Sequence, residues 1–216
     1  MSAYRNIMFD LDGTLTDSGR AVMSSVEYAL SQLGYAKQPV EKLRTFIGPS
    51  LHDSFVREYD MDEESIVKAL GLYRDIYEKE RMYDVDIYDG IPELLERIKA
   101  QGMSALVITS KPMYFTERIM DRIGLARFFD HMVGPDLSDN SSDKKRLIEK
   151  AVTDFNLNKD ECIMIGDTKY DILGAVQAGI ASIGVTYGYG SKEELRNNGA
   201  SFITADTKGI AQILGI

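Results

Sequence analysis

The feature that most constrains this chain is a short apolar run that ends in two carboxylates. Ile-Met-Phe at positions 7–9 is followed by Asp10, Leu11 and Asp12, and then by glycine and threonine. An apolar run of this length is typical of a buried strand in a parallel sheet. In open α/β sheets, ligands bind outside the carboxyl ends of the strands. The sequence therefore predicts that Asp10 and Asp12 lie at a ligand site.

The segment that follows this strand has the periodicity of helices. Apolar residues recur three or four positions apart over residues 22–33, 40–46, 51–59 and 66–77, and no strand pattern interrupts them. This segment is too long to be a single crossover between strands. We therefore expect residues 17–84 to form an inserted small α-helical cap domain. The Tyr73 and Tyr77 stripe within it is interpreted as packing.

From residue 85 onward, short apolar runs alternate with helical patterns. Such alternation is typical of an α/β fold with a doubly wound, mostly parallel sheet. Residues 1–16 and 85–216 are predicted to form this α/β core, with a polar loop over residues 136–143. Later strands are expected at residues 104–108, 131–133, 162–165, 181–185 and 201–203.

Polar side chains fall where three of these strands end. Asp10, Thr109 and Asp167 each follow an apolar run, and Asp171 stands one helical turn beyond Asp167. Right-handed crossovers bring these strand ends to one edge of the sheet. Carboxylates so close together repel one another unless a cation joins them. Oxygen ligands favour Mg²⁺, and His52 and His131 are too isolated to suggest zinc.

These motifs resemble those of the haloacid dehalogenase superfamily of hydrolases. The segment 10–16 is similar to its first motif, 107–110 to its second, Lys144 to its third and 166–171 to its fourth. The helical insertion after the first motif matches members with a helical cap. Within the superfamily, the chain is most similar to the phosphoglycolate phosphatase group, including relatives described as 5′-nucleotidases. The segments 46–49, 109–112 and 184–191 carry this closer likeness.

The resemblance implies a Mg²⁺-dependent phosphatase that acts through an aspartyl-phosphate. Asp10 would be the nucleophile, and Asp12 the general acid and base. Asp10, the backbone carbonyl of Asp12, and Asp167 would hold Mg²⁺, with Asp171 binding it directly or through water. The implied phosphate-binding groups are Thr109, Ser110 and Lys144, with Lys144 chosen over its neighbour Lys145.

The cap is expected to determine which phosphate monoester is bound. Candidate lining residues are Arg20, Phe46, Ile47 and Gly48, and hinges are expected near residues 16–17 and 84–89. Phosphoglycolate, a nucleoside 5′-monophosphate and another metabolite stay open as substrates, and sequence does not exclude a phosphomutase.

A dehalogenase of this fold fits the acidic residues less well. A phospho-acceptor receiver module needs neither the cap nor Asp12. The glycine-rich segment 188–190 lacks the lysine of a P-loop and is interpreted as an ordinary loop.

Charge and composition exclude several other classes of function. The net charge is −9, and no basic block suggests nucleic-acid binding. No apolar run approaches the length of a membrane span, and no signal peptide is expected. Cys162 is the single cysteine, so no internal disulfide can form, and a cytoplasmic location is the simplest interpretation. The expected partner is a small phosphate ester, and the chain could be a monomer or a homodimer.

Overall fold

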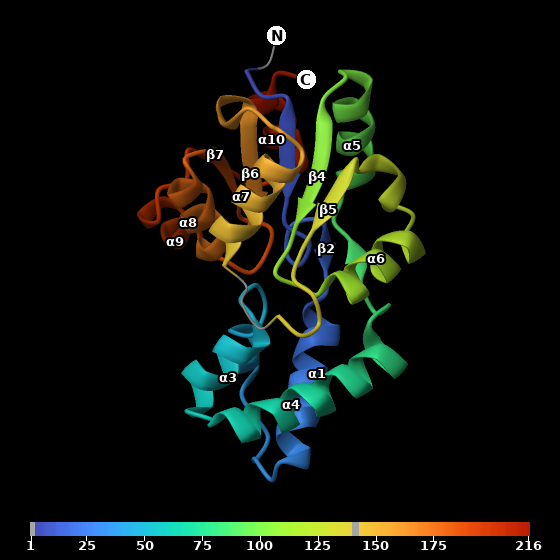
Figure 1. Ribbon diagram of the computed structural model, residues 1–216, viewed down its shortest axis with the longest axis vertical. Coiled ribbons are helices and arrows are strands. Elements are labelled where there is room, and N and C mark those ends of the chain that lie inside the picture. Colours follow the sequence, from blue (N-terminus) through green and yellow to red (C-terminus); the bar gives the residue numbers. More distant parts are fainter. Residues whose placement is uncertain (1–2, 140–142) are drawn as a thin grey trace.

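The computed structural model describes residues 3–139 and 143–216, and it consists of an α/β part and a helical part (Figure 1). The helical part lies beyond the carboxyl ends of the strands, below the α/β part in Figure 1. The predicted loop over residues 136–143 has no helix or strand where it is described, and residues 140–142 lie outside the described residues.

Within the described ranges, six parallel strands form the main sheet in the order β5-β4-β1-β6-β7-β8. The central strand β1 pairs with β4 on one side and β6 on the other. Phe9, the last residue of β1, stands opposite Val107 and Ile165. All three strands therefore end at the same edge. The strands are β1 (Asn6–Phe9), β4 (Ser104–Ile108), β5 (His131–Val133), β6 (Cys162–Gly166), β7 (Ala181–Val185) and β8 (Phe202–Thr204).

Helices cover both faces of this sheet. On one face, Ile7 and Phe9 pack with residues of α5 and α10. On the other face, Met8 packs with residues of α7 and α8. Because successive strand residues point to opposite faces, the uninterrupted apolar run of β1 is buried on both sides. The prediction of a doubly wound, parallel α/β fold is confirmed. The helices of this part are α5 (Ile91–Ala100), α6 (Met113–Arg122), η2 (Ala126–Phe128), α7 (Lys144–Asp154), η3 (Lys159–Glu161), α8 (Lys169–Ala178), α9 (Lys192–Asn197) and α10 (Thr207–Leu214).

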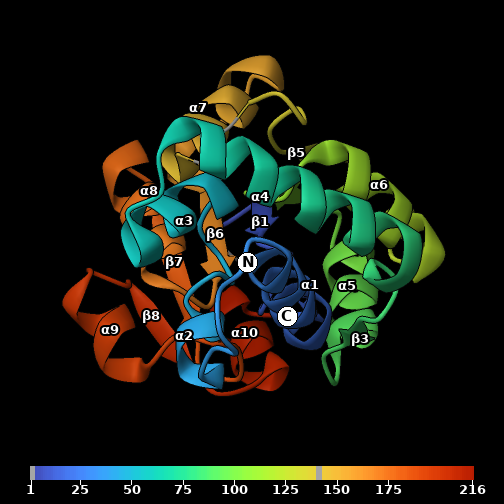
Figure 2. The same ribbon diagram turned by 90° about the horizontal axis from the view of Figure 1, so that it is seen from below.

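The helical part has its own apolar core. Val26, Leu30, Ile66 and Leu70 are buried in it, and the rings of Phe46 and Phe55 meet edge to face with centroids 5.0 Å apart. Figure 2 views the molecule from this end, with the long helix α4 running across the view and α1 seen nearly end-on. Its elements are α1 (Gly19–Gln32), α2 (Val40–Arg44), α3 (Leu51–Tyr59), α4 (Glu63–Ile76) and a π-helical turn η1 (Tyr77–Arg81).

Both connections between the two parts run through one small antiparallel ribbon. Strand β2 (Thr16–Asp17) leads out of the α/β part and β3 (Asp86–Ile87) leads back, with Thr16 opposite Ile87 and Asp17 opposite Asp86. The sequence showed no strand here, because two residues are too few to display a period. The ribbon lies where hinges are expected.

Candidate active site

The site begins with three residues that directly follow neighbouring strands. The N–H of Asp10 donates to the carbonyl of Ile165 (2.9 Å), and the N–H of Thr109 donates to that of Val133 (3.0 Å). These bonds continue the ladders of the sheet by one residue, so the backbone fixes both positions. Asp167 follows β6, the other neighbour of β1. The structure thus brings together the three strand ends that the sequence predicted would meet.

A tight loop after Asp10 brings the chain against Asp167. Gly13 has φ +95°, and a Cβ there would lie 2.2 Å from Asp167 Oδ2. The next hydroxyl, Thr14 Oγ1, donates to Asp167 Oδ1 (3.2 Å). Glycine is needed at position 13 for two reasons: the backbone is left-handed, and a carboxylate occupies the side-chain space.

The glycine-rich segment 188–190 forms the other wall around Asp167. The N–H of Tyr189 donates to Asp167 Oδ2 (2.8 Å), and the hydroxyl of Tyr187 donates to the carbonyl of Thr14 (2.9 Å). A Cβ on Gly188 would lie 2.4 Å from Asp167 Oδ2. The sequence reading missed this role, since glycines allow a backbone to approach a carboxylate without displaying a recognisable motif.

Lys144 and Asp171 complete the buried cluster. Lys144 Nζ lies 2.7 Å from Asp10 Oδ1, 2.9 Å from Asp171 Oδ1, and donates to the carbonyl of Ile108 (3.0 Å). Asp171 also accepts from the N–H (3.1 Å) and hydroxyl (2.8 Å) of Thr168, in a capping box at the start of α8. Lys144 is 3% exposed, whereas the Lys145 side chain is 40% exposed and faces Glu149. The geometry therefore separates two lysines that were adjacent candidates in the sequence.

The three carboxylates fit a divalent cation. Asp10, Asp167 and Asp171 each offer an oxygen, and these oxygens lie within 4.8 Å of one another. Burial raises the pKa of Asp10 to about 7, against the attraction of Lys144. Burial and the neighbouring Asp171 and Asp10 raise the pKa of Asp167 well above its usual value. One lysine cannot neutralise three buried acids, and a hard cation with oxygen ligands would remove this repulsion.

A cavity opens beside this cluster, and the predicted phosphate-binding hydroxyls line it. Thr109 and Ser110 are both on its wall. The Lys111 N–H donates to Thr109 Oγ1 (3.1 Å), which leaves the Thr109 hydroxyl hydrogen available. Ser110 Oγ is buried and has no hydrogen-bond partner among the described residues. A buried hydroxyl without a partner is unfavourable unless a ligand satisfies it. Both hydroxyls therefore suit an oxygen-rich ligand.

Asp12 is placed apart from the three clustered acids. Its carboxylate lines the cavity and lies 2.8 Å from Lys111 Nζ. The same Lys111 Nζ donates to the hydroxyl of Tyr77 (2.9 Å), which belongs to the helical part. Sequence reasoning did not assign Lys111 to the site. Its signal was a lysine directly after the Thr109-Ser110 pair at a strand end, in a chain that otherwise repels anions.

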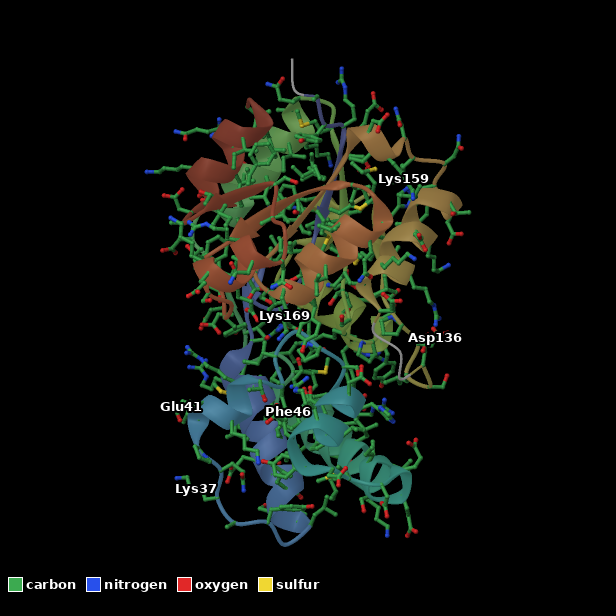
Figure 3. The ribbon with its side chains drawn as sticks, turned by 90° about the vertical axis from the view of Figure 1, so that its left-hand side faces the viewer. Lys37, Glu41, Phe46, Asp136, Lys159 and Lys169 are labelled. Carbon is green, nitrogen blue, oxygen red and sulfur yellow. The ribbon has the colours of Figure 1, made fainter. Side chains whose placement is uncertain are left out.

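The helical part supplies the far wall of the cavity. Phe46, Ile47 and Gly48 line it, as predicted, together with Tyr73 and Tyr77. Figure 3 labels Phe46 within the helical part and Lys169 at the end of the α/β part that faces the helical part. The Tyr73 and Tyr77 rings stack with centroids 5.2 Å apart, so their predicted packing role and a place on the cavity wall coexist.

Arg20 does not line this cavity, in contrast to the prediction. Its side chain is 70% exposed and forms a bidentate pair with Asp84, beside the β2–β3 ribbon. In the same turn of α1, Ala21 and Val22 are buried, whereas the Arg20 side chain points to solvent. Arg20 therefore belongs to the connection between the two parts.

Membrane insertion through a helix has no support in the described part of the chain: none of its helices combines the length and apolar character that a span requires.

Comparison with known proteins points to the same family as the sequence motifs. Residues 7–185 match the family model of haloacid dehalogenase-like hydrolases. The chain is 38% identical over 211 residues to a 5′-nucleotidase of Pseudomonas aeruginosa, covering 98% of this chain and 96% of that protein. It is 28% identical over 218 residues to a phosphoglycolate phosphatase of Vibrio parahaemolyticus, with 97% and 96% covered. The crystal structure of a predicted phosphatase from Clostridium acetobutylicum superposes with a TM-score of 0.95 at 40% identity, covering 99% of each chain.

The family match spans the acidic strand ends and the Lys144 position, and the superposition covers 99% of the chain and so extends over both parts of the molecule. The resemblance that the sequence motifs indicated is confirmed, and the proteins described above are named as a 5′-nucleotidase, a phosphoglycolate phosphatase and a predicted phosphatase. The chain belongs to the haloacid dehalogenase-like hydrolase family.

Proposed function

We propose that this hydrolase is a Mg²⁺-dependent phosphatase that cleaves a small phosphate monoester through an aspartyl-phosphate. The observation that carries the proposal is the different setting of two carboxylates two residues apart. Asp10 is buried with Lys144 in the acidic cluster, while Asp12 faces the cavity beside Lys111. A nucleophile and a proton donor need these two environments.

The proposed reaction has two steps on these residues. A carboxylate oxygen of Asp10 forms a bond to phosphorus as the ester P–O bond breaks, and Asp12 gives its proton to the leaving alkoxide. Asp12 then takes a proton from water, which attacks the aspartyl-phosphate and releases inorganic phosphate and the Asp10 carboxylate. Thr109 and Ser110 on the cavity wall, and Lys144 beside Asp10, would bind the phosphoryl oxygens during both steps.

The residues that would hold the cation are Asp10, Asp167 and Asp171, with the carbonyl of Asp12 as a further candidate. When bound, Mg²⁺ supplies positive charge that offsets the negative charge of the phosphate and the carboxylates. Thr14, Tyr189 and Thr168 hold the ligand carboxylates by the hydrogen bonds described above.

The helical part, residues 17–84, is proposed to act as a cap that excludes water and selects the substrate. Its contribution to the cavity suits a small-molecule substrate. A cytoplasmic location is the one that we propose. A phosphoglycolate-type substrate is the first candidate, and a nucleoside 5′-monophosphate is the second, favoured by the similarity to the P. aeruginosa 5′-nucleotidase. A phosphomutase would share the same chemistry but would not release phosphate to water.

Phosphate release from p-nitrophenyl phosphate tests the proposed reaction. The wild-type chain with Mg²⁺ should turn over, and Asp10→Asn, which keeps the shape but removes the nucleophile, should lose on the order of 10⁴-fold or more of kcat, as expected when a covalent nucleophile is lost. EDTA should abolish turnover and Mg²⁺ should restore it. Unchanged turnover in Asp10→Asn would refute the nucleophile, and EDTA-resistant turnover would refute the metal requirement.

A further inference from the structure

One face of α4 and the following turn lines the cavity. Leu70, Tyr73, Arg74 and Tyr77 all belong to the cavity wall, and their spacing is i, i+3, i+4 and i+7. This is one stripe of a helix. Three of its members are apolar or aromatic, and the fourth is a guanidinium.

The other cations at this cavity have carboxylate partners. Lys111 pairs with Asp12 (2.8 Å), and Lys144 behind the wall pairs with Asp10 and Asp171. His52, on the cavity wall, faces Asp53 and Glu63.

Arg74 differs from all of them. Over residues 3–139 and 143–216, no carboxylate lies within ion-pair distance of its guanidinium, and it has no side-chain hydrogen bond to a described residue. The side chain is half-buried, and burial lowers the pKa of its guanidinium with no carboxylate to offset the effect. Taking a charge out of water without a partner costs free energy, so the Arg74 position is explained best by a ligand that supplies the opposite charge.

We propose that Arg74 binds a second anionic group of the substrate, at the end away from the phosphate that is cleaved. The inference rests on the proposed phosphatase function and adds a substrate class: phosphate monoesters that also carry a carboxylate or a second phosphate. The cleaved phosphate itself is held on the α/β side by Asp10, Thr109 and Ser110, so a cation on the opposite, helical wall is placed for the other end. A guanidinium suits this task because its fork of N–H donors matches both carboxylate and phosphate oxygens.

Matched substrate pairs test the assignment. Phosphoglycolate is compared with 2-hydroxyethyl phosphate, which replaces its carboxylate with a neutral hydroxymethyl group. The bisphosphate of 1,3-propanediol is compared with its monophosphate. We expect the wild-type kcat/KM to favour at least one anionic member by roughly tenfold to a hundredfold, the range for a hydrogen bond to a charged group. Which pair shows the preference identifies the carboxylate or the second phosphate.

Arg74→Gln should remove most of this preference and leave kcat/KM for the neutral members within about threefold. Arg74→Lys should retain part of it, because a charge remains but the fork is lost. Lys68→Gln is the control: it removes one positive charge from the exposed side of the same helix, where Lys68 pairs with Glu64. It should leave the preference unchanged. Melting curves confirm that each variant is folded.

Equal losses for anionic and neutral substrates in Arg74→Gln would refute the proposal, as would a wild type with no preference in either pair. A preference for nucleoside 5′-monophosphates over both anionic substrates would also overturn it. These failures are distinguishable from failure of the phosphatase itself, because p-nitrophenyl phosphate turnover and its loss in Asp10→Asn do not depend on Arg74.

Discussion

Three side chains form a continuous polar connection between the helical part and the reacting groups. The Lys111 amine contacts both the Asp12 carboxylate and the Tyr77 hydroxyl, and Lys111 and Tyr77 are both buried. Tyr77 begins the π-helical turn η1, a conformation that often occurs at functional sites. We therefore expect Lys111 to position Asp12, and Tyr77 of the helical part in turn holds Lys111.

Replacement of Lys111 by Met tests this connection. The variant keeps the length of the side chain but leaves Asp12 without its cation, and we expect kcat/KM for p-nitrophenyl phosphate to fall about a hundredfold, as for removal of a buried charged partner. Tyr77→Phe should lower it less, about tenfold, because one hydrogen bond to a charge is lost. Tyr35→Phe, on the exposed side of the cap, is the matched control. Wild-type activity in Lys111→Met would contradict the role.

A second prediction concerns Gly13. Alanine there would have a strained left-handed backbone and a Cβ 2.2 Å from Asp167 Oδ2. We expect a loss of about 1–2 kcal/mol in stability from the backbone alone, and a higher Mg²⁺ concentration for half-maximal activity because Asp167 must move. Thermal melting and a Mg²⁺ titration measure the two effects.

Gly71 offers the matched control for Gly13. It lies inside α4, and a Cβ there would meet nothing within 4 Å. Gly71→Ala should therefore stabilise the chain by about 0.5–1 kcal/mol. A Gly13→Ala protein with unchanged melting and Mg²⁺ requirement would contradict the close approach seen here.

The helical part and the α/β part contact each other at several points around the cavity. Besides Lys111 and Tyr77, the Tyr114 hydroxyl of α6 donates to Glu78 of η1. On the opposite side, Arg57 of α3 donates to the Tyr170 hydroxyl of α8 (3.2 Å). The two parts are therefore joined by side-chain contacts on both sides, in addition to the β2–β3 ribbon.

The exposed Arg20–Asp84 pair beside the ribbon is expected to contribute little to stability or activity. Because Arg20 and Asp84 are both solvent-accessible, Arg20→Gln should leave the melting temperature nearly unchanged. It should also leave kcat/KM within about twofold, since Arg20 is not on the cavity wall. Melting and steady-state kinetics check both values. A tenfold loss of kcat/KM would place Arg20 back among the substrate-binding residues.

The strands of the main sheet were predictable to within a residue, and the central ones are continuously apolar because they are buried on both faces. β4 and β7 begin and end where the sequence indicated. The same pattern located Asp10, Thr109 and Asp167. The sequence pattern could not identify residues whose role depends on what lies across the cavity. In the sequence, Lys111 and Arg74 cannot be distinguished from ordinary solvated cations, because their surroundings form only in the folded chain. The exposure of Arg20 beside the ribbon was likewise not visible in the sequence.

For the molecule as a whole, the acidic cluster links stability to pH and metal. In the metal-free chain, the folded pKa values of Asp10 and Asp167 lie above those of the unfolded chain, Asp10 at about 7 against 3.8. The folded state therefore binds more protons. Their contribution to stability is complete below about pH 4 and is lost as the pH rises through the folded values.

Magnesium should reverse this loss. Because Mg²⁺ competes with the protons, it should raise the melting temperature more at pH 8 than at pH 5. At pH 8 the total stabilisation should be about 2.7 kcal/mol when the Mg²⁺ concentration is a hundred times the Kd at that pH. Melting curves with EDTA and with Mg²⁺ at both pH values measure this. Asp167→Asn should reduce the difference. Equal stabilisation by Mg²⁺ at both pH values would contradict the coupling.

The β2–β3 ribbon has one more consequence. Because Thr16 faces Ile87 and Asp17 faces Asp86, the ends of the helical insert are only one strand spacing apart, about 5 Å. Any compact module whose termini lie that close could be grafted at this point without disturbing the six-stranded sheet or its acidic edge. On the proposed function, exchange of the insert at this ribbon would change the substrate selectivity and leave the reaction chemistry of the sheet edge in place.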